Sequence, residues 1–299
     1  MMLETTLPDQ AQILRGMMQR HGLPSDPPAG PRARTVALTS GKGGVGKSVL
    51  SLNLAIALRK MGHSVCLLDA CLGLGSLDLL CDRQSYWNLS HVVSGARTVA
   101  DIVIDGPAGI SLVPGASGLL DLADCSTMAQ RAILDQLADL EQNHDYLVID
   151  TGPGIHEQVR RFALAAELVC VVATPEPTAV ADAYASVRAL TANNPELEPR
   201  LIVNEVDSPE QAHEILSRVQ RTARSFLNVS VAGVGYVPYD QAVPRAVARR
   251  SPVLVDSART PASRAIEQIA LKLAETLSPR SESRPFFARF APPLSRHVA

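Results

Sequence analysis

The chain has 299 residues, of which 46% are hydrophobic and 19% are charged, so it has enough apolar surface for a large core and is not a globally disordered protein. A net charge of −2 and only 5 Phe, 5 Tyr and 1 Trp argue against broad capture of nucleic acid. None of the 5 cysteines forms a C-x-x-C pair, so we expect no zinc or iron–sulfur site. The absence of a signal-like segment and of a run of about 18 apolar residues predicts a cytoplasmic protein that does not span a membrane.

The first predicted element is a short amphipathic helix within an N-terminal arm and linker, residues 1–33. Asp9 is a suitable helix cap, Ala11 and Leu14 fall on one helical stripe, and Gly22 ends the segment. A lone helix of about 13 residues is only marginally stable in water, so we expect it to become ordered on a partner protein. The alternative is that it packs on its own domain.

Residues 34–278 have the pattern of a single α/β domain. Seven short runs rich in Val, Ile and Leu lack strict alternation, which is typical of strands buried on both faces. These runs lie at 35–40, 64–69, 110–115, 146–152, 168–175, 200–206 and 231–238, and longer helical stretches lie between them at 47–61, 127–142, 178–192, 209–225 and 261–277. This alternation predicts one doubly wound, mostly parallel sheet with helices on both faces.

The first predicted strand leads directly into GKGGVGKS, residues 41–48, and then into a helix. This fits the phosphate-binding pattern G-x-x-x-x-G-K-[ST] in its proper strand–loop–helix context; the alternative is a chance glycine-rich turn. We expect Lys47 to reach the nucleotide's β- and γ-phosphates and the Ser48 hydroxyl to bind Mg²⁺. The residues predicted to surround the phosphates are Gly41, Gly43, Gly44, Val45, Gly46, Lys47, Ser48 and Val49.

Lys42 gives this loop a second lysine, so that K-G-G-V-G-K-[ST] resembles the deviant Walker A motif of the MinD/ParA family of dimerising ATPases. The resemblance implies a P-loop fold, ATP and Mg²⁺ as cofactors, and a homodimer in the ATP-bound state. It also implies that Lys42 contacts the nucleotide of the partner subunit. The alternative for Lys42 is a solvated loop lysine.

The resemblance extends along the other strand ends of the domain. It assigns Asp69 to the first switch loop and Asp150 to the strand that holds a Mg²⁺-bound water, with capping of a helix as the alternative for Asp150. Together with Lys42 and Lys47, these two carboxylates form the predicted catalytic set, and Ser48, Asp69 and Asp150 form the predicted metal set. Base contacts are expected from Asn204, Pro238 and Asp240, although a strand-end Asn or Asp is a turn former about as often as a ligand.

Two segments indicate the FlhG branch of this family, also called FleN or YlxH. DACLGLGSLDLLC at 69–81 resembles a segment shared by MinD and FlhG, and DQAQILR at 9–15 matches the D-Q-A-x-x-L-R motif of FlhG. The resemblance implies an arm that binds an FlhF-type GTPase, with Gln10 inserted near the partner's nucleotide. Flagellar switch-ring proteins or a FleQ-type activator are further implied partners, and no direct contact with nucleic acid is expected. The predicted partner-binding residues are Asp9, Gln10, Ala11, Leu14 and Arg15.

Cys71 stands where the family has a second Asp in the switch loop. That Asp helps to position the water that attacks the γ-phosphate, and a thiol with an ordinary pKa near 8.5 is a poor replacement. We therefore expect ATP hydrolysis that is slow, or that relies on another group. A redox role for Cys71 is the weaker alternative, because no other cysteine lies at motif spacing.

The C-terminal tail, residues 279–299, contains Phe286, Phe287 and Phe290 interleaved with arginines. This pattern predicts a short basic amphipathic anchor at the inner face of the cell membrane, and MinD and FlhG both end in membrane-targeting helices. The alternatives are a tail docked on the domain and a tail without fixed structure.

The sequence thus predicts an FlhG-type ATPase that regulates flagellar number or placement through partner proteins at the membrane. One alternative is an ATP-sensing antiactivator, a binding module with weak or no hydrolysis, which Cys71 favours. The other is a MinD-type regulator of the division site, against which the arm motif argues.

Overall fold

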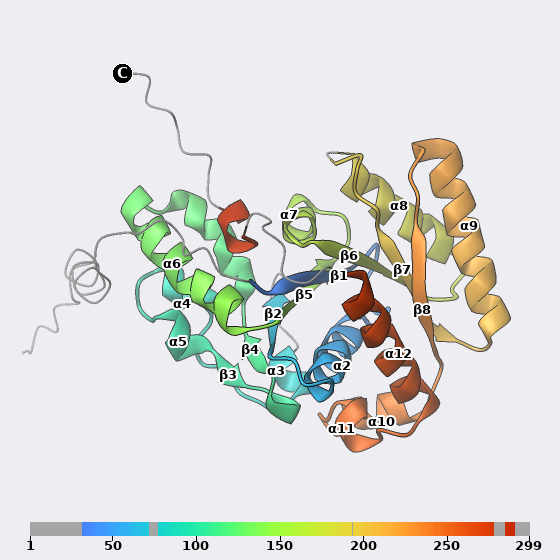
Figure 1. The fold of residues 1–299 in the computed structure, drawn as a ribbon, viewed down its shortest axis with the longest axis horizontal. Helices are drawn as coiled ribbons and strands as arrows, with labels where there is room; N and C mark the ends of the chain where they lie inside the picture. Colours follow the sequence, from blue (N-terminus) through green and yellow to red (C-terminus); the bar gives the residue numbers. More distant parts are fainter. Residues whose placement is uncertain (1–31, 72–76, 193, 278–284, 291–299) are drawn as a thin grey trace, which may run out of the picture.

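The computed structural model describes residues 32–71, 77–192, 194–277 and 285–290 (Figure 1). The predicted partner-binding residues of the N-terminal arm lie outside these ranges. None of the helices in the described part of the chain is long and apolar enough to cross a lipid bilayer.

One sheet of eight strands, in the order β3-β4-β2-β5-β1-β6-β7-β8, forms the centre of the molecule. All neighbouring strands are parallel except β3, which pairs antiparallel with β4 at one edge. The seven predicted strands are therefore present, and β3 is the addition. The strands are β1 (Arg34–Ser40), β2 (Val65–Ala70), β3 (Ile104–Asp105), β4 (Ser111–Val113), β5 (Tyr146–Pro153), β6 (Leu168–Ala173), β7 (Arg200–Val206) and β8 (Ala232–Pro238).

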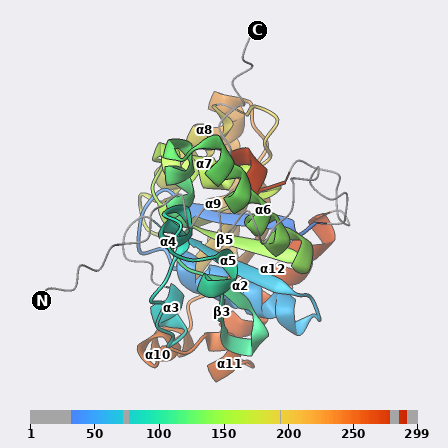
Figure 2. The same ribbon diagram turned by 90° about the vertical axis from the view of Figure 1, so that its left-hand side faces the viewer.

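Helices cover both faces of this sheet, as the doubly wound prediction requires (Figures 1 and 2). The five long predicted helices are α2 (Lys47–Lys60), α6 (Thr127–Asn143), α8 (Ala179–Thr191), α9 (Pro209–Leu227) and α12 (Pro261–Thr276). The sequence did not predict the shorter ones, which are α3 (Leu77–Leu80), α4 (Leu89–Val93), α5 (Val99–Ile102), α7 (Glu157–Ala165), α10 (Ala242–Ala248) and α11 (Val253–Asp256).

The two faces of the sheet build two hydrophobic cores. One face packs against α4 to α9, and the other packs against α2, α3 and α10 to α12. Strands β2 and β6 are buried along their whole length, which explains their continuous apolar runs. Several helices begin where the sequence supplies a cap: Ser126, Ser208 and Thr260 each accept a hydrogen bond from a backbone N–H of the first turn.

The described part of the C-terminal tail contributes to the first of these cores. Phe286, Phe287 and Phe290 are only 2%, 1% and 2% exposed, and a short 3₁₀ helix over Phe287–Phe290 lies against α6 and α7. The Glu141 carboxylate of α6 accepts hydrogen bonds from the backbone N–H groups of Phe286 and Phe287 at 3.2 and 2.9 Å. The three rings are therefore docked on the domain, and the prediction that they form an exposed anchor is wrong for this conformation. The physical reason is that the groove beside α6 and α7 gives them the same apolar surroundings that a bilayer would.

Candidate functional site

The carboxyl ends of the central strands converge where β1 runs into the phosphate loop. Strand pairing places Asp69 of β2 directly beside Asp150 of β5, and β1 pairs with the other side of β5. This edge is where open α/β sheets bind their ligands.

The loop between β1 and α2 has the backbone shape that a phosphate cradle needs. Gly44 and Gly46 have φ angles of 82° and 76°, a left-handed conformation that favours glycine. A Cβ atom at Gly46 would lie 2.4 Å from Nδ2 of Asn204, and one at Gly41 would lie 2.4 Å from the carbonyl oxygen of Asp182. These glycines therefore serve both backbone geometry and close packing against β7 and α8.

Lys47 lies at the start of α2 with its side chain turned onto β5. Its Nζ donates a hydrogen bond to Oδ1 of Asp150 at 2.7 Å, and Ser51 Oγ donates to the same oxygen at 2.9 Å. Both members of the ion pair are buried, with side chains 7% and 1% exposed. The second carboxylate oxygen of Asp150, Oδ2, is buried and has no hydrogen-bond partner in the described part of the chain. A buried carboxylate with an unsatisfied oxygen is suited to hold a metal-bound water.

Asp69 completes this arrangement. Burial and the neighbouring charge of Asp150 raise the pKa of Asp69 to about 6, although the N–H groups of Cys71 and Leu77 donate to its carboxylate. Two carboxylates held this close favour binding of a cation between or near them. Among the described residues no cluster of three or more His, Cys, Asp or Glu side chains could hold a metal by itself. The donor set thus fits Mg²⁺ that takes its other oxygens from Ser48, the nucleotide and water.

Lys42, the second lysine of the loop, is held by acidic side chains of its own subunit. It forms an ion pair with Glu176, lies 3.6 Å from Asp182, and has Thr178 Oγ1 at 3.4 Å. The hydrogen bond to Glu176 is the main cause of a raised pKa for Lys42, so the side chain carries its positive charge at neutral pH. In this conformation Lys42 is therefore not a free loop lysine.

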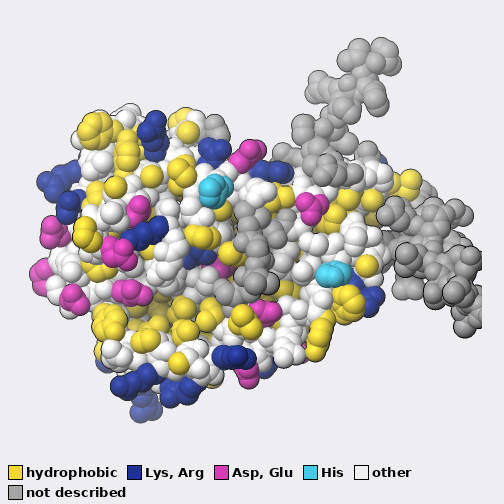
Figure 3. All heavy atoms as spheres, turned by 180° about the vertical axis from the view of Figure 1, so that it is seen from behind, with side chains coloured by type: hydrophobic (Ala, Val, Ile, Leu, Met, Phe, Trp, Pro, Cys, Tyr) yellow, Lys and Arg dark blue, Asp and Glu magenta, His cyan; other side chains and the backbone are white. Residues whose placement is uncertain are grey.

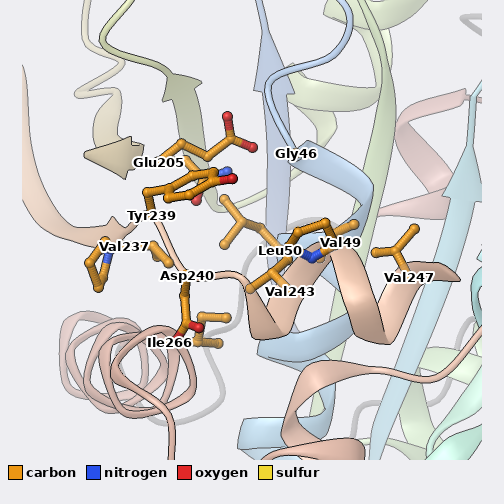
Figure 4. A pocket seen from close by; sticks show the side chains of 13 residues that line it. Gly46, Val49, Leu50, Glu205, Val237, Tyr239, Asp240, Val243, Val247 and Ile266 are labelled. Carbon is orange, nitrogen blue, oxygen red and sulfur yellow. The ribbon is translucent and has the colours of Figure 1, made fainter. Parts of the chain in front are cut away.

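A cavity of about 320 Å³ opens beside Gly46 (Figure 4). It brings together three residues that the sequence nominated as base contacts, Asn204, Pro238 and Asp240. Its walls are mostly apolar, and Glu205 and Tyr239 lie on the opposite side of the cavity from the helix α10 in Figure 4. Its further lining residues are Val49, Leu50, Glu205, Val237, Tyr239, Val243, Pro244, Val247 and Ile266. An apolar slot next to a phosphate loop has the shape and surroundings of a site for a nucleotide base.

Two of the nominated base contacts also have structural partners. Asn204 donates from Nδ2 to the carbonyl oxygen of Val45 at 2.9 Å and so supports the phosphate loop. Asp240 accepts hydrogen bonds from the backbone N–H groups of Ala242 and Ala262, at 2.9 and 3.2 Å. Burial acts to raise the pKa of Asp240, but these hydrogen bonds and one from Thr260 lower it overall. The Asp240 carboxylate thus joins the N-termini of α10 and α12, a structural role of the kind that the turn-former alternative allowed.

Cys71 is half-buried at the end of β2, and its backbone N–H donates to Oδ1 of Asp69 at 3.1 Å. Burial and the Asp69 charge raise the pKa of the Cys71 thiol, so it is not a thiolate at neutral pH. Reactive cysteines need a lowered pKa. The structure therefore does not favour the redox alternative for Cys71.

Sequence reasoning missed the acidic groups that hold Lys42 and the serine that shares Asp150 with Lys47. Glu176 and Asp182 follow β6, and Ser51 lies one turn beyond the loop on α2. The rule that ligands gather after the carboxyl ends of strands could have indicated Glu176, because it lies three residues after β6 ends. No local signal distinguishes Ser51 from any other helical serine.

Comparison with known proteins agrees with this geometry. Residues 36–253 match the family model of the CobQ/CobB/MinD/ParA nucleotide binding domain. The chain is 35% identical over 240 residues to the antiactivator FleN of Pseudomonas aeruginosa, covering 80% of this chain and 86% of that protein. It is 33% identical over 264 residues to the flagellum site-determining protein YlxH of Helicobacter pylori, covering 85% and 88%.

Solved structures show the same fold at lower identity. The septum site-determining protein MinD of Pyrococcus horikoshii, complexed with Mg-ADP, has a TM-score of 0.64 at 18% identity and covers 84% of this chain and 100% of that one. The MinC:MinD cell division complex of Aquifex aeolicus gives 0.63 at 24%, covering 85% and 98%. With its P-loop, its paired strand-end carboxylates and these relatives, the chain belongs to the FlhG (FleN/YlxH) branch of the MinD/ParA family of P-loop ATPases.

Proposed function

We propose that this protein is an ATP-dependent dimerising ATPase of the FlhG type, which regulates flagellar number or placement through partner proteins. The observation that carries the nucleotide part is the convergence of Lys47, Asp69 and Asp150 behind the phosphate loop, beside the cavity at Gly46. The flagellar part is supported by the identity to FleN and YlxH.

Different residues of the site bind the phosphates, the Mg²⁺ ion and the base of the nucleotide. Loop N–H groups and Lys47 bind the phosphates, and Lys47 must leave Asp150 to reach them. Ser48 and the two carboxylates hold Mg²⁺, which supplies charge neutralisation at the phosphates when bound. Asn204, Pro238, Leu50 and Val243, which line the cavity, would hold the base.

Lys42 has a second role in this proposal. In the described conformation Glu176 and Asp182 hold it within its own subunit. In the ATP-bound dimer it turns to the partner subunit's nucleotide, whose phosphates replace the two carboxylates as its counter-charge. Dimerisation therefore breaks the ion pairs of Lys42 and forms new ones across the interface.

The arm and the membrane complete the proposal. An FlhF-type GTPase binds the arm segment that contains Gln10, and switch-ring proteins or a FleQ-type activator bind one state of the dimer. The protein works in the cytoplasm, in peripheral contact with the cell membrane. Contact through Phe286, Phe287 and Phe290 would first require these rings to leave the core.

A second candidate function is an antiactivator whose output is protein contact, with little ATP turnover. Cys71 favours it because the thiol replaces a carboxylate near the attacking water, and FleN is named as an antiactivator. Single-turnover hydrolysis on purified protein separates the two functions: a rate at background supports the antiactivator without an enzymatic cycle.

Light scattering with Mg²⁺ and a non-hydrolysable ATP analogue tests the dimer. Lys42→Ala should still bind nucleotide but stay monomeric, whereas Lys60→Ala, a change at the far end of α2, should dimerise like the wild type. A Lys42→Ala protein that dimerises normally would contradict the claim that this lysine acts across the interface.

The arm is tested with a peptide of residues 1–22, which should stimulate an FlhF-type GTPase. The Gln10→Ala peptide should lose most of that stimulation while it retains binding.

A further inference from the structure

The modest net charge of the chain conceals a strongly basic segment. Residues 245–264 contain five arginines and one acidic residue, a net charge of +4, whereas the whole chain carries −2. All other residues together therefore carry −6. Charge this concentrated produces a local field that the total does not reveal.

Hydrogen bonds hold α10, α11 and the first turn of α12, which contain this segment, in fixed positions relative to one another. The Asp240 carboxylate joins the N-termini of α10 and α12, and Ser263 Oγ donates to the carbonyl oxygen of Ser257 at 2.8 Å. Leu254 of α11 is fixed on α2, because its N–H donates to Asn53 at 3.0 Å and its carbonyl oxygen accepts from Lys60 at 2.8 Å. The basic residues are thus displayed by a preformed scaffold.

All five arginines of this segment are exposed, and we call their surface the arginine face. Arg249 pairs with Asp256, and Arg250 lies 3.6 Å from Asp82 in a pair whose members are 63% and 72% exposed. For the other three, no ion pair is recorded within the described ranges of the chain. Figures 1 and 2 place α10 and α11 at the lower edge of the molecule, and Figure 3 shows Lys and Arg side chains gathered there below a band of hydrophobic ones. The members of the arginine face are Arg245, Arg249, Arg250, Arg259 and Arg264.

Apolar side chains are exposed beside these arginines. Val247 of α10 is 37% exposed and Val255 of α11 is 52% exposed. A nucleic-acid backbone offers phosphates to the arginines but nothing to an exposed valine. Sequence-tolerant binding of single strands needs stacking rings, and residues 245–264 contain no aromatic side chain. An anionic bilayer offers both phosphate headgroups for the arginines and an apolar layer below them.

We propose that the arginine face binds the anionic headgroups of a lipid membrane, with Val255 entering the headgroup layer. This inference deepens the membrane part of the proposed function and rests on it. It supplies a contact that leaves the three tail phenylalanines in the core. Because α10 and α12 also line the nucleotide cavity, the same two helices carry the nucleotide contacts on one side and the membrane contacts on the other.

Co-sedimentation of the full chain with vesicles tests the proposal. Vesicles of phosphatidylglycerol and phosphatidylcholine are compared with vesicles of phosphatidylcholine alone. The test variant replaces four arginines, Arg245→Gln, Arg250→Gln, Arg259→Gln and Arg264→Gln, and keeps Arg249 in its ion pair. The control replaces four exposed arginines of α8 and α9 with the same change in charge, namely Arg188→Gln, Arg218→Gln, Arg221→Gln and Arg224→Gln.

Each basic residue near an anionic bilayer strengthens binding roughly fivefold, so the test variant should bind the anionic vesicles at least about tenfold more weakly than the wild type. The control should remain within about twofold of the wild type, and Val255→Ser should lose binding severalfold. Equal losses in test variant and control would overturn the proposal, because general charge would then be the cause. Tighter binding to duplex DNA that displaces the vesicles, with Val255→Ser unaffected, would also overturn it in favour of nucleic acid.

ATP hydrolysis and analogue-dependent dimerisation of both sets are measured in parallel. The hydrolysis rate and the dimerisation of the test and control variants should equal those of the wild type. Equal values would show that the variants are folded. A wild type that fails to hydrolyse ATP or to dimerise would count against the proposed function, while its vesicle binding would still test the arginine face.

Discussion

Replacing Asp150 with Asn removes the negative charge that faces a buried ammonium group. Lys47 Nζ lies 2.7 Å from Oδ1 of Asp150, and the two side chains are 7% and 1% exposed, so solvent does not screen the loss. Breaking a buried pair from one side costs about 3–5 kcal/mol. In a domain of this size each kcal/mol lowers Tm by about 2–4 °C, so Asp150→Asn should lower the Tm of the nucleotide-free protein by about 6–20 °C.

Thermal unfolding and urea titration without nucleotide measure this loss. Ser51→Ala is the matched control, because it removes the other hydrogen bond to the same oxygen and leaves the ion pair intact. It should cost about 1 kcal/mol. A loss below about 1 kcal/mol for Asp150→Asn would refute the reasoning, because Lys47 would then have another counter-charge or access to water.

Nucleotide binding gives a second test of Asp150→Asn, in which the variant should gain more thermal stability than the wild type. Lys47 must leave Asp150 to reach phosphates, so Asp150 competes with ATP for this ammonium group. In the presence of a chelator, ATP without Mg²⁺ should therefore raise the Tm of Asp150→Asn by more than it raises that of the wild type. An equal or smaller rise in the variant would show that this competition does not exist.

Three further predictions concern Asp69, Cys71 and the tail. Because the pKa of Asp69 is raised to about 6, the folded state holds this proton more tightly than the unfolded state, and stability falls as pH rises through about 4 to 6. Asp69→Asn should remove that part of the fall, and nucleotide-free denaturation curves at pH 4 and 7 that differ equally in variant and wild type would contradict it. Cys71→Asp should raise kcat about 10²–10⁴-fold with little change in nucleotide Kd, and an unchanged turnover would show that another group positions the water. Phe287→Ala should cost about 3–5 kcal/mol because the ring is 1% exposed, whereas a loss below about 1 kcal/mol in urea titration would show that the tail is not docked in solution.

The sequence alone predicts much of this fold for a simple physical reason. Parallel strands buried on both faces must be continuously apolar, so seven of them are visible as Val/Ile/Leu runs, and the loop with Lys47 follows the first of them directly. The pairing of Asp69 with Asp150 could also be expected, since both lie near the carboxyl ends of central strands. Contacts set by distant parts of the chain could not, and Lys42 is the clearest example, because its partner Glu176 lies 134 residues away.

The tail shows a different limit of sequence reasoning. Phenylalanines between arginines have the same pattern whether the rings enter a bilayer or a protein groove, because both environments are apolar. The groove also supplies polar partners, among them Glu141, a buried carboxylate on α6 that accepts hydrogen bonds from the N–H groups of Phe286 and Phe287. A single Glu inside a helical stretch gives no sign of such a distant partner.

Glu141 also contacts both the first and the last described segments of the chain. Its backbone carbonyl oxygen accepts a hydrogen bond from Ala33 N–H at 2.7 Å, where the described chain enters β1, while its side chain holds the segment that returns after α12. The point where the described chain begins is therefore close to the docked phenylalanines. A pull on the arm would therefore act on the same turn of α6 whose carboxylate holds the phenylalanines.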